Sequence, residues 1–417
     1  MEEIMNFQIR NFGPIKEADI DIGKINIIGG HNATGKSSAS KLLYCFLKAS
    51  CNKRQDFAYE SLSNSISVIL SRIKDDVRLN RRTRDMDFTE LLEEFEHSKD
   101  EYYSSEKYTY NKFLERDINN IDNSIEEIQE NGDSLYLSIL RSLLRIEFLN
   151  NTINGQISFD EDSFNLSSLF TPPQENISNK IIKPKFYQEI YDVFYVDSFS
   201  IFDLNRAPHS FRLRRNGYYS HVDYLNLMLR DSEDQSVEMF DDTWNENIIL
   251  VEEKINNIIN GKIEFNRGFR YVSKDSEPYP MQNTASGIKQ IGIIQLLLSN
   301  RKLKEDSFII IDEPEVNLHP EWQFKFAEIL LLLVKELNIS IYINTHSPMF
   351  IEAIEVFSNY YGLKDDTYYY LTKFKDSGYE FKYIDVNNLY ELYDELSKPY
   401  MSLEKYRRKS KNNDNSN

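Results

Sequence analysis

The sequence predicts an α/β fold, a mixed sheet with flanking helices that is interrupted by a mostly helical inserted lobe. Three observations carry this prediction. A short apolar run at 24–28 leads through a glycine-rich loop into a helix-compatible segment at 36–49. Two further apolar runs, at 307–311 and 340–344, end in polar residues and precede helical patterns. Between these halves, residues 88–130 are acidic, rich in tyrosine and free of glycine.

Length and composition are those of a folded protein. The 417 residues, of which 41% are hydrophobic, suffice for two or three domains. No apolar run approaches the ~20 residues of a membrane helix, and the first residues lack the apolar core of a secretion signal. We therefore expect a cytoplasmic protein that does not act at a membrane. Cys45 and Cys51 are too few for a zinc site and are expected to be idle thiols.

Composition shifts divide the chain into five parts. We expect the N-terminal part of the α/β unit at 1–58, an acidic helical lobe at 59–185 and a connecting strand with helices at 186–261. The C-terminal part of the unit would follow at 262–400, and a polar, frayed tail at 401–417. Within the lobe, the interval 150–185 has the composition of a loop.

Hydrophobic periodicity places the individual elements. Strands are predicted at 4–11, 18–22, 24–28, 193–196, 262–271, 307–311, 340–344, 367–371 and 380–384. Helices are predicted at 36–49, 135–149, 221–230, 246–260, 286–298, 320–337 and 386–397.

The glycine-rich loop, GHNATGKS at 30–37, fits the phosphate-loop pattern G-x-x-x-x-G-K-S in full. Its glycines let backbone N–H groups surround phosphates at a helix N-terminus, where negative charge is favoured. Lys36 would reach the β- and γ-phosphates and Ser37 would ligate Mg²⁺. The loop therefore predicts ATP and Mg²⁺ as cofactors, with the nucleotide held by Gly30, Asn32, Gly35, Lys36, Ser37 and Ser38.

The apolar run at 307–311 ends in Asp312 and Glu313. Ligands bind at the carboxyl ends of strands in α/β sheets, so both carboxylates would face the nucleotide. Asp312 would hold Mg²⁺, directly or through water, and Glu313 would polarise the attacking water.

Two further motifs flank this acidic pair. Ser286, which we expect to cap the helix that follows, and Gly287 form a second candidate anion site at a helix N-terminus. His346 follows the strand at 340–344, where its side chain could face the γ-phosphate.

Together these motifs resemble the ABC-type ATPase heads of the SMC, RecF and OLD group. The resemblance covers about residues 1–50 and 262–400, with FQIRNFGPI at 7–15, DEPEVNLHP at 312–320 and THSP at 345–348. It implies a homodimer, or a higher homo-oligomer, in which two heads sandwich two ATP molecules. Hydrolysis of ATP would then release the two heads.

The resemblance also implies roles by position. Ser286 and Gly287 would touch the γ-phosphate bound by the other head, whereas Asn317 and His319 would lie at the dimer seam. Two departures stand out. Ile288 replaces the second glycine of many signature motifs, and no glutamine occupies a recognisable Q-loop, for which the segment 195–198 is the candidate.

The length and pattern of the segment between the two α/β halves indicate which kind of ATPase this is. This segment is short and lacks the sustained heptads of SMC coiled coils. Only 71 residues follow His346, with no Asp-x-Asp, and the six histidines are scattered, so TOPRIM or HNH nuclease chemistry is not expected. This arrangement resembles the stand-alone ATPases of the AbiL, PARIS and Septu anti-phage systems. The resemblance implies control of a separate effector, a nuclease or toxin.

Two other functions stay open at this stage, a RecF-like DNA repair ATPase and a transporter ATPase subunit. DNA binding would use basic residues that could instead pair with the neighbouring acidic stretch: Arg72, Lys74, Arg78, Arg81, Arg82, Arg84, Arg212, Arg214 and Arg215. That stretch, 85–133, holds 16 acidic and 4 basic residues in a chain of net charge −18. It could dock a basic partner, mimic nucleic acid or form a solvated face.

Overall fold

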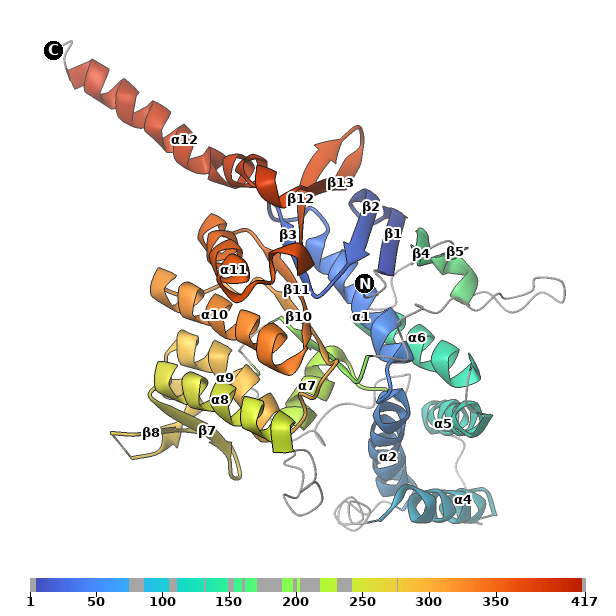
Figure 1. Ribbon diagram of the computed structural model, residues 1–417. Helices are drawn as coiled ribbons and strands as arrows, with labels where there is room; N and C mark the ends of the chain where they lie inside the picture. The colour runs from blue at the N-terminus through green and yellow to red at the C-terminus, as the bar shows by residue number, and fades with distance from the viewer. Residues whose placement is uncertain are drawn as a thin grey trace.

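The protein is described here by a computed structural model (Figure 1). The structure describes residues 5–74, 86–104, 111–130, 133–148, 154–159, 162–170, 190–197, 201–202, 218–230, 242–275 and 277–414.

A mixed sheet of ten strands forms the centre of the described part of the chain. The strand order is β5 (Asp162–Asn165), β4 (Gln156–Phe159), β1 (Met5–Phe12), β2 (Ile15–Ile22), β13 (Gly378–Ile384), β12 (Thr367–Lys375), β3 (Ile25–Gly29), β11 (Ser340–Thr345), β10 (Phe308–Asp312) and β6 (Val193–Val196). The five strands from β12 to β6 run parallel. The predicted mixed sheet is therefore confirmed.

The parallel strands read as continuous apolar runs because both faces are covered by helices. In β10, Ile309, Ile310 and Ile311 have no exposed surface, and each such side chain contributes about 1.5–3 kcal/mol on burial. Figure 1 shows α1 (Lys36–Ser50) on one side of these strands and α10 (Pro320–Leu337) and α11 (Pro348–Tyr361) on the other. The carboxyl ends of β3, β6, β10 and β11 consequently meet at one edge of the sheet.

Four helices form the inserted lobe: α2 (Arg54–Ile73), α4 (Phe88–Ser104), α5 (Lys112–Glu130) and α6 (Asp133–Glu147). Helix α2 packs against α4 and α5, and α6 packs against α1 of the sheet unit. The acidic helices have apolar inner faces, as shown by Phe95 of α4 and Ile118 of α5, which are fully buried. Amphipathic periodicity thus accounts for the lobe despite its charge.

Basic residues at the C-terminal end of α2 and just after it pair with the acidic helices. Arg72 lies 3.3 Å from Asp117 of α5, and Lys74 lies 2.5 Å from Glu94 of α4. Both cations are therefore engaged inside the lobe. The other basic residues considered for DNA, at 78–84 and 212–215, lie outside the described residues.

A second, smaller group lies beside α10 in Figure 1. It contains α8 (Asp242–Ile258), α9 (Ser286–Ser299) and a three-stranded antiparallel sheet of β7 (Gly261–Phe265), β8 (Phe269–Ser273) and β9 (Tyr279–Pro280). Helix α7 (His221–Arg230) packs on both β6 and α9 and so connects this group to the main sheet.

Two sequence expectations about the helices and strands were wrong. Within the supposed loop, β4 and β5 extend the main sheet, because Ile157 and Phe159 are buried and Phe159 stacks on Phe7 of β1 at 5.0 Å. Their polar neighbours had hidden this short apolar alternation. The supposed frayed tail instead continues α12 (Tyr390–Asp414), in a segment rich in the helix formers Glu, Lys and Arg. Among the described residues, no helix is long and apolar enough to cross a membrane.

Candidate nucleotide-binding site

The phosphate loop joins β3 to α1 and has the backbone geometry of a cradle. Gly30 (φ 157°) and Gly35 (φ 99°) adopt conformations that favour glycine. A Cβ on Gly30 would lie 1.8 Å from Oγ1 of Thr372, and one on Gly35 would lie 2.5 Å from Cγ1 of Ile15. Glycine is therefore required at both ends of the loop, at Gly30 just after β3 and at Gly35 just before α1. Asn32, at the crest of the loop, is exposed.

Lys36, the first residue of α1, folds back over the loop. Its Nζ donates to the carbonyl oxygens of Gly30 (2.8 Å) and His31 (2.7 Å). Burial lowers the pKa of Lys36, while the nearby carboxylates of Glu313, Asp312 and Glu315 act in the opposite direction. The ammonium is thus held at the position where a phosphate would replace the loop carbonyls as its partner.

Asp312 belongs to a closed ring of hydrogen bonds at the carboxyl edge of the sheet. Asn344 of β11 donates through Nδ2 to Oδ1 of Asp312 (2.9 Å) and to Oγ of Ser40 (2.8 Å). Tyr195 of β6 donates to Oδ2 of Asp312 (3.4 Å), and its hydroxyl lies 2.9 Å from Oγ of Ser40. Residues from three neighbouring elements, α1, β6 and β11, therefore fix the direction of the carboxylate that β10 carries.

Sequence reasoning missed Ser40, Asn344 and Tyr195 as supports of Asp312. Only Ser40 carries a signal in the local sequence. Ser40 lies one helical turn after Ser37, on the same face of α1. Tyr195 and Asn344 lie near the ends of the strands on either side of β10, which only the strand order reveals.

Behind Tyr195, His221 of α7 links the lobe to the sheet. Its Nδ1 lies 2.5 Å from Oε2 of Glu147, at the end of α6, and its Nε2 lies 2.9 Å from Oδ2 of Asp197, just after β6. Burial lowers the pKa of His221, but the two carboxylates outweigh this effect and raise it to about 9. A charged imidazole therefore joins the lobe to the strand that carries Tyr195.

Glu313 and His346 lie together beyond the strand ends. Glu313 adopts φ 53°, and its Oε1 lies 3.9 Å from Nδ1 of His346. Both side chains are more than a third exposed, so they can reach a ligand. Glu315, which the sequence did not single out, is buried and accepts a hydrogen bond from the backbone N–H of His346 (2.7 Å). It fixes the backbone that presents the histidine.

The signature segment, Ser286 and Gly287, differs from the prediction in one respect. Ser286 is the first residue of α9 rather than its cap, a position that Ala285 occupies. The Ser286 hydroxyl instead donates to the carbonyl oxygen of Asn317 (2.6 Å). A Cβ on Gly287 would lie 2.5 Å from the ring of Trp322 in α10, so glycine allows the two helices to approach.

The structure brings one part of the predicted site together and leaves another apart. Lys36, Asp312, Glu313 and His346 gather at one edge of the sheet, beside Ser37 and Ser38 in the first turn of α1. Ser286 and Gly287 are held by the segment at 317–322 instead. Among the described residues, no hydrogen bond or ion pair joins them to the phosphate loop.

The residues present fit a nucleoside triphosphate. The loop supplies a cradle with an ammonium, and the carboxylate of Asp312 is oriented at the same edge. A hydroxyl and one carboxylate, with phosphate and water oxygens, form the oxygen-rich set that Mg²⁺ prefers. Ser37 and Asp312 are the two side chains that would supply it.

The sequence matches the family model of the AAA ATPase domain designated AAA_15 over residues 3–351. The chain belongs to this family, and it is therefore an ATPase. A comparison with curated proteins finds no match.

Among solved structures, the chain is similar to the SMC head domain from Thermotoga maritima, with 10% identity and a TM-score of 0.36 over 92% of this chain and 99% of that one. It is also similar to an SmcHead bound to the C-terminal winged-helix domain of ScpA, with 12% identity and a TM-score of 0.39 over 93% and 99% of the two chains. A third is the Smc head domain with an extended coiled coil from Pyrococcus furiosus, also bound to ScpA, with 10% identity and a TM-score of 0.35 over 98% and 100%.

Proposed function

We propose that this ATPase is an ABC-type head that dimerises around ATP in the cytoplasm and controls a separate effector in anti-phage defence. The observation that carries the nucleotide chemistry is the convergence of Lys36, Asp312, Glu313 and His346 at the carboxyl ends of β3, β10 and β11. The motif resemblance supports the dimer. The defence role rests on that resemblance.

In this proposal each side chain has one task. Lys36 exchanges its loop carbonyls for the phosphates, and Ser37 and Asp312 hold Mg²⁺, which would neutralise charge that develops on them. Glu313 accepts the proton of the attacking water, and His346 contacts the γ-phosphate from beside it. Ser286 and Gly287 of the second head complete the site, and hydrolysis separates the heads.

The bond between Ser286 and Asn317 supports coupling between the two parts of the dimer seam. Ser286 opens the signature helix, and Asn317 belongs to the segment that follows the acidic pair. Asn317 itself has φ 60°, an unusual conformation for a residue other than glycine. A change in nucleotide state at Asp312 and Glu313 can thus reach the signature helix within the same chain.

We expect Tyr195→Phe to raise the Mg²⁺ concentration for half-maximal ATPase activity by about tenfold, because Asp312 loses one of its two supporting donors. The rate at saturating Mg²⁺ should change much less. Steady-state hydrolysis measured across Mg²⁺ concentrations tests this expectation. Tyr342→Phe is the matched control, since its hydroxyl is buried and has no hydrogen-bond partner among the residues that the structure describes. Equal Mg²⁺ dependence in both variants would rule out a positioning role for Tyr195.

The effector is tested by co-purification. We would purify the tagged protein from cells that carry its native gene neighbourhood, with and without phage infection, and identify polypeptides that accompany it. A partner with nuclease or toxin residues, absent from preparations of the Lys36→Ala variant, is the expected result. Purification of the ATPase alone under both conditions would contradict control of an effector.

A further inference from the structure

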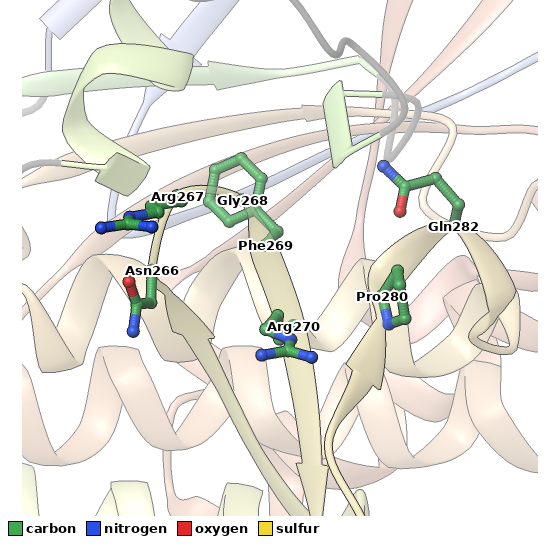
Figure 2. Close-up of a pocket in the computed structure, with 7 residues that line it drawn as sticks. All are labelled: Asn266, Arg267, Gly268, Phe269, Arg270, Pro280 and Gln282. Carbon is green, nitrogen blue, oxygen red and sulfur yellow. The ribbon is translucent and has the colours of Figure 1, made fainter.

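A pocket of about 660 Å³ lies on the three-stranded sheet, away from the phosphate loop. Its walls come from the β7–β8 turn with the start of β8, and from the end of β9 with the segment that follows it, as Figure 2 shows. Asn266, Arg267 and Arg270 line one side, and Gln282 lines the other. None of the motifs assigned to ATP chemistry belongs to this wall.

The pocket is positively charged in a strongly acidic protein. Arg267 and Arg270 are both exposed, and neither forms an ion pair among the described residues. The lining contains no acidic residue. Glu264 lies opposite Arg270 in the strand register, but its carboxylate is bound by Lys262 at 2.6 Å. Two guanidinium groups are therefore available in a chain of net charge −18.

The pocket also has a firm apolar base. Phe269 is 5% exposed and packs edge-on against Phe202, with ring centroids 5.0 Å apart. The guanidinium of Arg230, from α7, lies 5.4 Å from the Phe269 ring centroid and adds positive charge behind it. At the rim, the backbone N–H of Asn266 donates to the carbonyl of Gly268 (3.1 Å), which closes the turn that carries Arg267. The guanidinium groups are thus mounted on an ordered hairpin.

We propose that this pocket binds a phosphate-bearing ligand of nucleotide size. Guanidinium groups match phosphate oxygens with paired N–H donors, and two of them flank the cavity. The side-chain amide of Asn266 offers a donor and an acceptor, which suits the polar edges of a sugar or base. The volume falls within the range of small-ligand sites. The nucleotide could be free or part of an oligonucleotide, because both present the same phosphate.

A hydrogen bond connects the pocket wall to the signature helix α9. Lys289 of α9 donates through Nζ to the carbonyl oxygen of Gln282 (3.3 Å), and the Gln282 side chain donates to the carbonyl oxygen of Phe202 (3.2 Å). A ligand that engages Gln282 would therefore act on the segment that leads into Ser286. Binding itself does not depend on the function proposed above, whereas an effect on ATP hydrolysis does.

Fluorescence anisotropy on the full-length protein tests the proposal, with the phosphate loop first saturated by a non-hydrolysable ATP analogue. The probes are fluorescein-labelled AMP, a short oligothymidylate and a polyglutamate peptide of matched charge. We expect the double variant Arg267→Glu and Arg270→Glu to weaken binding of AMP or oligothymidylate by about tenfold or more. Lys335→Glu, which makes one of the same charge changes at an exposed position in the last turn of α10, should leave it unchanged.

The probes distinguish the sources of the phosphate. Binding of AMP with no gain for the longer probe identifies a free nucleotide. Tighter binding of oligothymidylate than of AMP identifies a nucleic acid. The slope of log K against log salt concentration should then be shallower by about 1.4 in the double variant, because two phosphate contacts are lost. Equal affinity for polyglutamate would overturn phosphate recognition. Unchanged binding in the double variant, or no binding of AMP and oligothymidylate to the wild type, would overturn the site.

Discussion

Replacing Lys36 with alanine is expected to weaken ATP binding by about 100-fold or more. The ammonium of Lys36 is buried at the loop and makes two charge-assisted hydrogen bonds, to Gly30 and His31, that phosphate oxygens would take over. Each such bond is stronger than a neutral one, and 1.4 kcal/mol corresponds to about a factor of ten in affinity. Isothermal titration calorimetry with ATP measures the change directly.

Two variants separate loss of binding from loss of fold. Lys36→Met keeps most of the length of the side chain without the charge, and it should lose affinity as the alanine variant does. Lys335→Ala removes a cation that is exposed on α10 and should bind ATP normally. Wild-type affinity for ATP in either Lys36 variant would contradict the assignment of residues 30–37 as the phosphate loop.

Replacing Glu313 with glutamine is expected to slow hydrolysis by about 100-fold to 1,000-fold while ATP still binds. Glutamine keeps the shape of the side chain but cannot accept the proton of water, and general base catalysis contributes about 10²–10⁴-fold. Glu313 is suited to this task because it is partly exposed at the end of β10, beside His346. A radiolabelled phosphate-release assay under single-turnover conditions measures the chemical step.

Glu315 supplies the matched control for Glu313. It lies two residues further on but is buried, accepts a hydrogen bond from the backbone N–H of His346, and has its Oε1 3.1 Å from the His346 Nδ1. We expect Glu315→Gln to retain this acceptor through its amide oxygen and to hydrolyse ATP far faster than Glu313→Gln. Normal turnover by Glu313→Gln, or an equal loss in both variants, would contradict the assigned roles.

The ATP-binding half of the site was predictable because its signals are local. The phosphate loop is contiguous in sequence, and the apolar run before Asp312 identifies a buried strand without knowledge of its neighbours. Strand ends converge in any parallel sheet, so Lys36, Asp312 and His346 could be placed together before the fold was known. The same reasoning gave the sheet class and the bounds of α10 and β6.

The supports of the site were not predictable because they depend on strand order and close packing. Tyr195 reaches Asp312 only because β6 pairs with β10, although more than a hundred residues separate them. Ser286 does not cap α9 as expected, and its hydroxyl instead donates to the carbonyl oxygen of Asn317, which lies outside that helix. The strands at 156–165 were missed because their apolar residues are few and become buried only against β1.

An ATP-dependent cross-link between two copies tests the proposed mechanism most directly. The double variant Asn32→Cys and Ser286→Cys, in the Glu313→Gln background, places a thiol on the phosphate loop and another on the signature helix. The native Cys45 and Cys51 are fully buried, and burial raises the pKa of both thiols, that of Cys51 to about 12, so they should not compete. With ATP and a short bismaleimide, we predict a covalent dimer that neither single-cysteine variant forms. A protein that binds ATP but stays uncross-linked, or cross-links equally without ATP, would contradict the sandwich dimer.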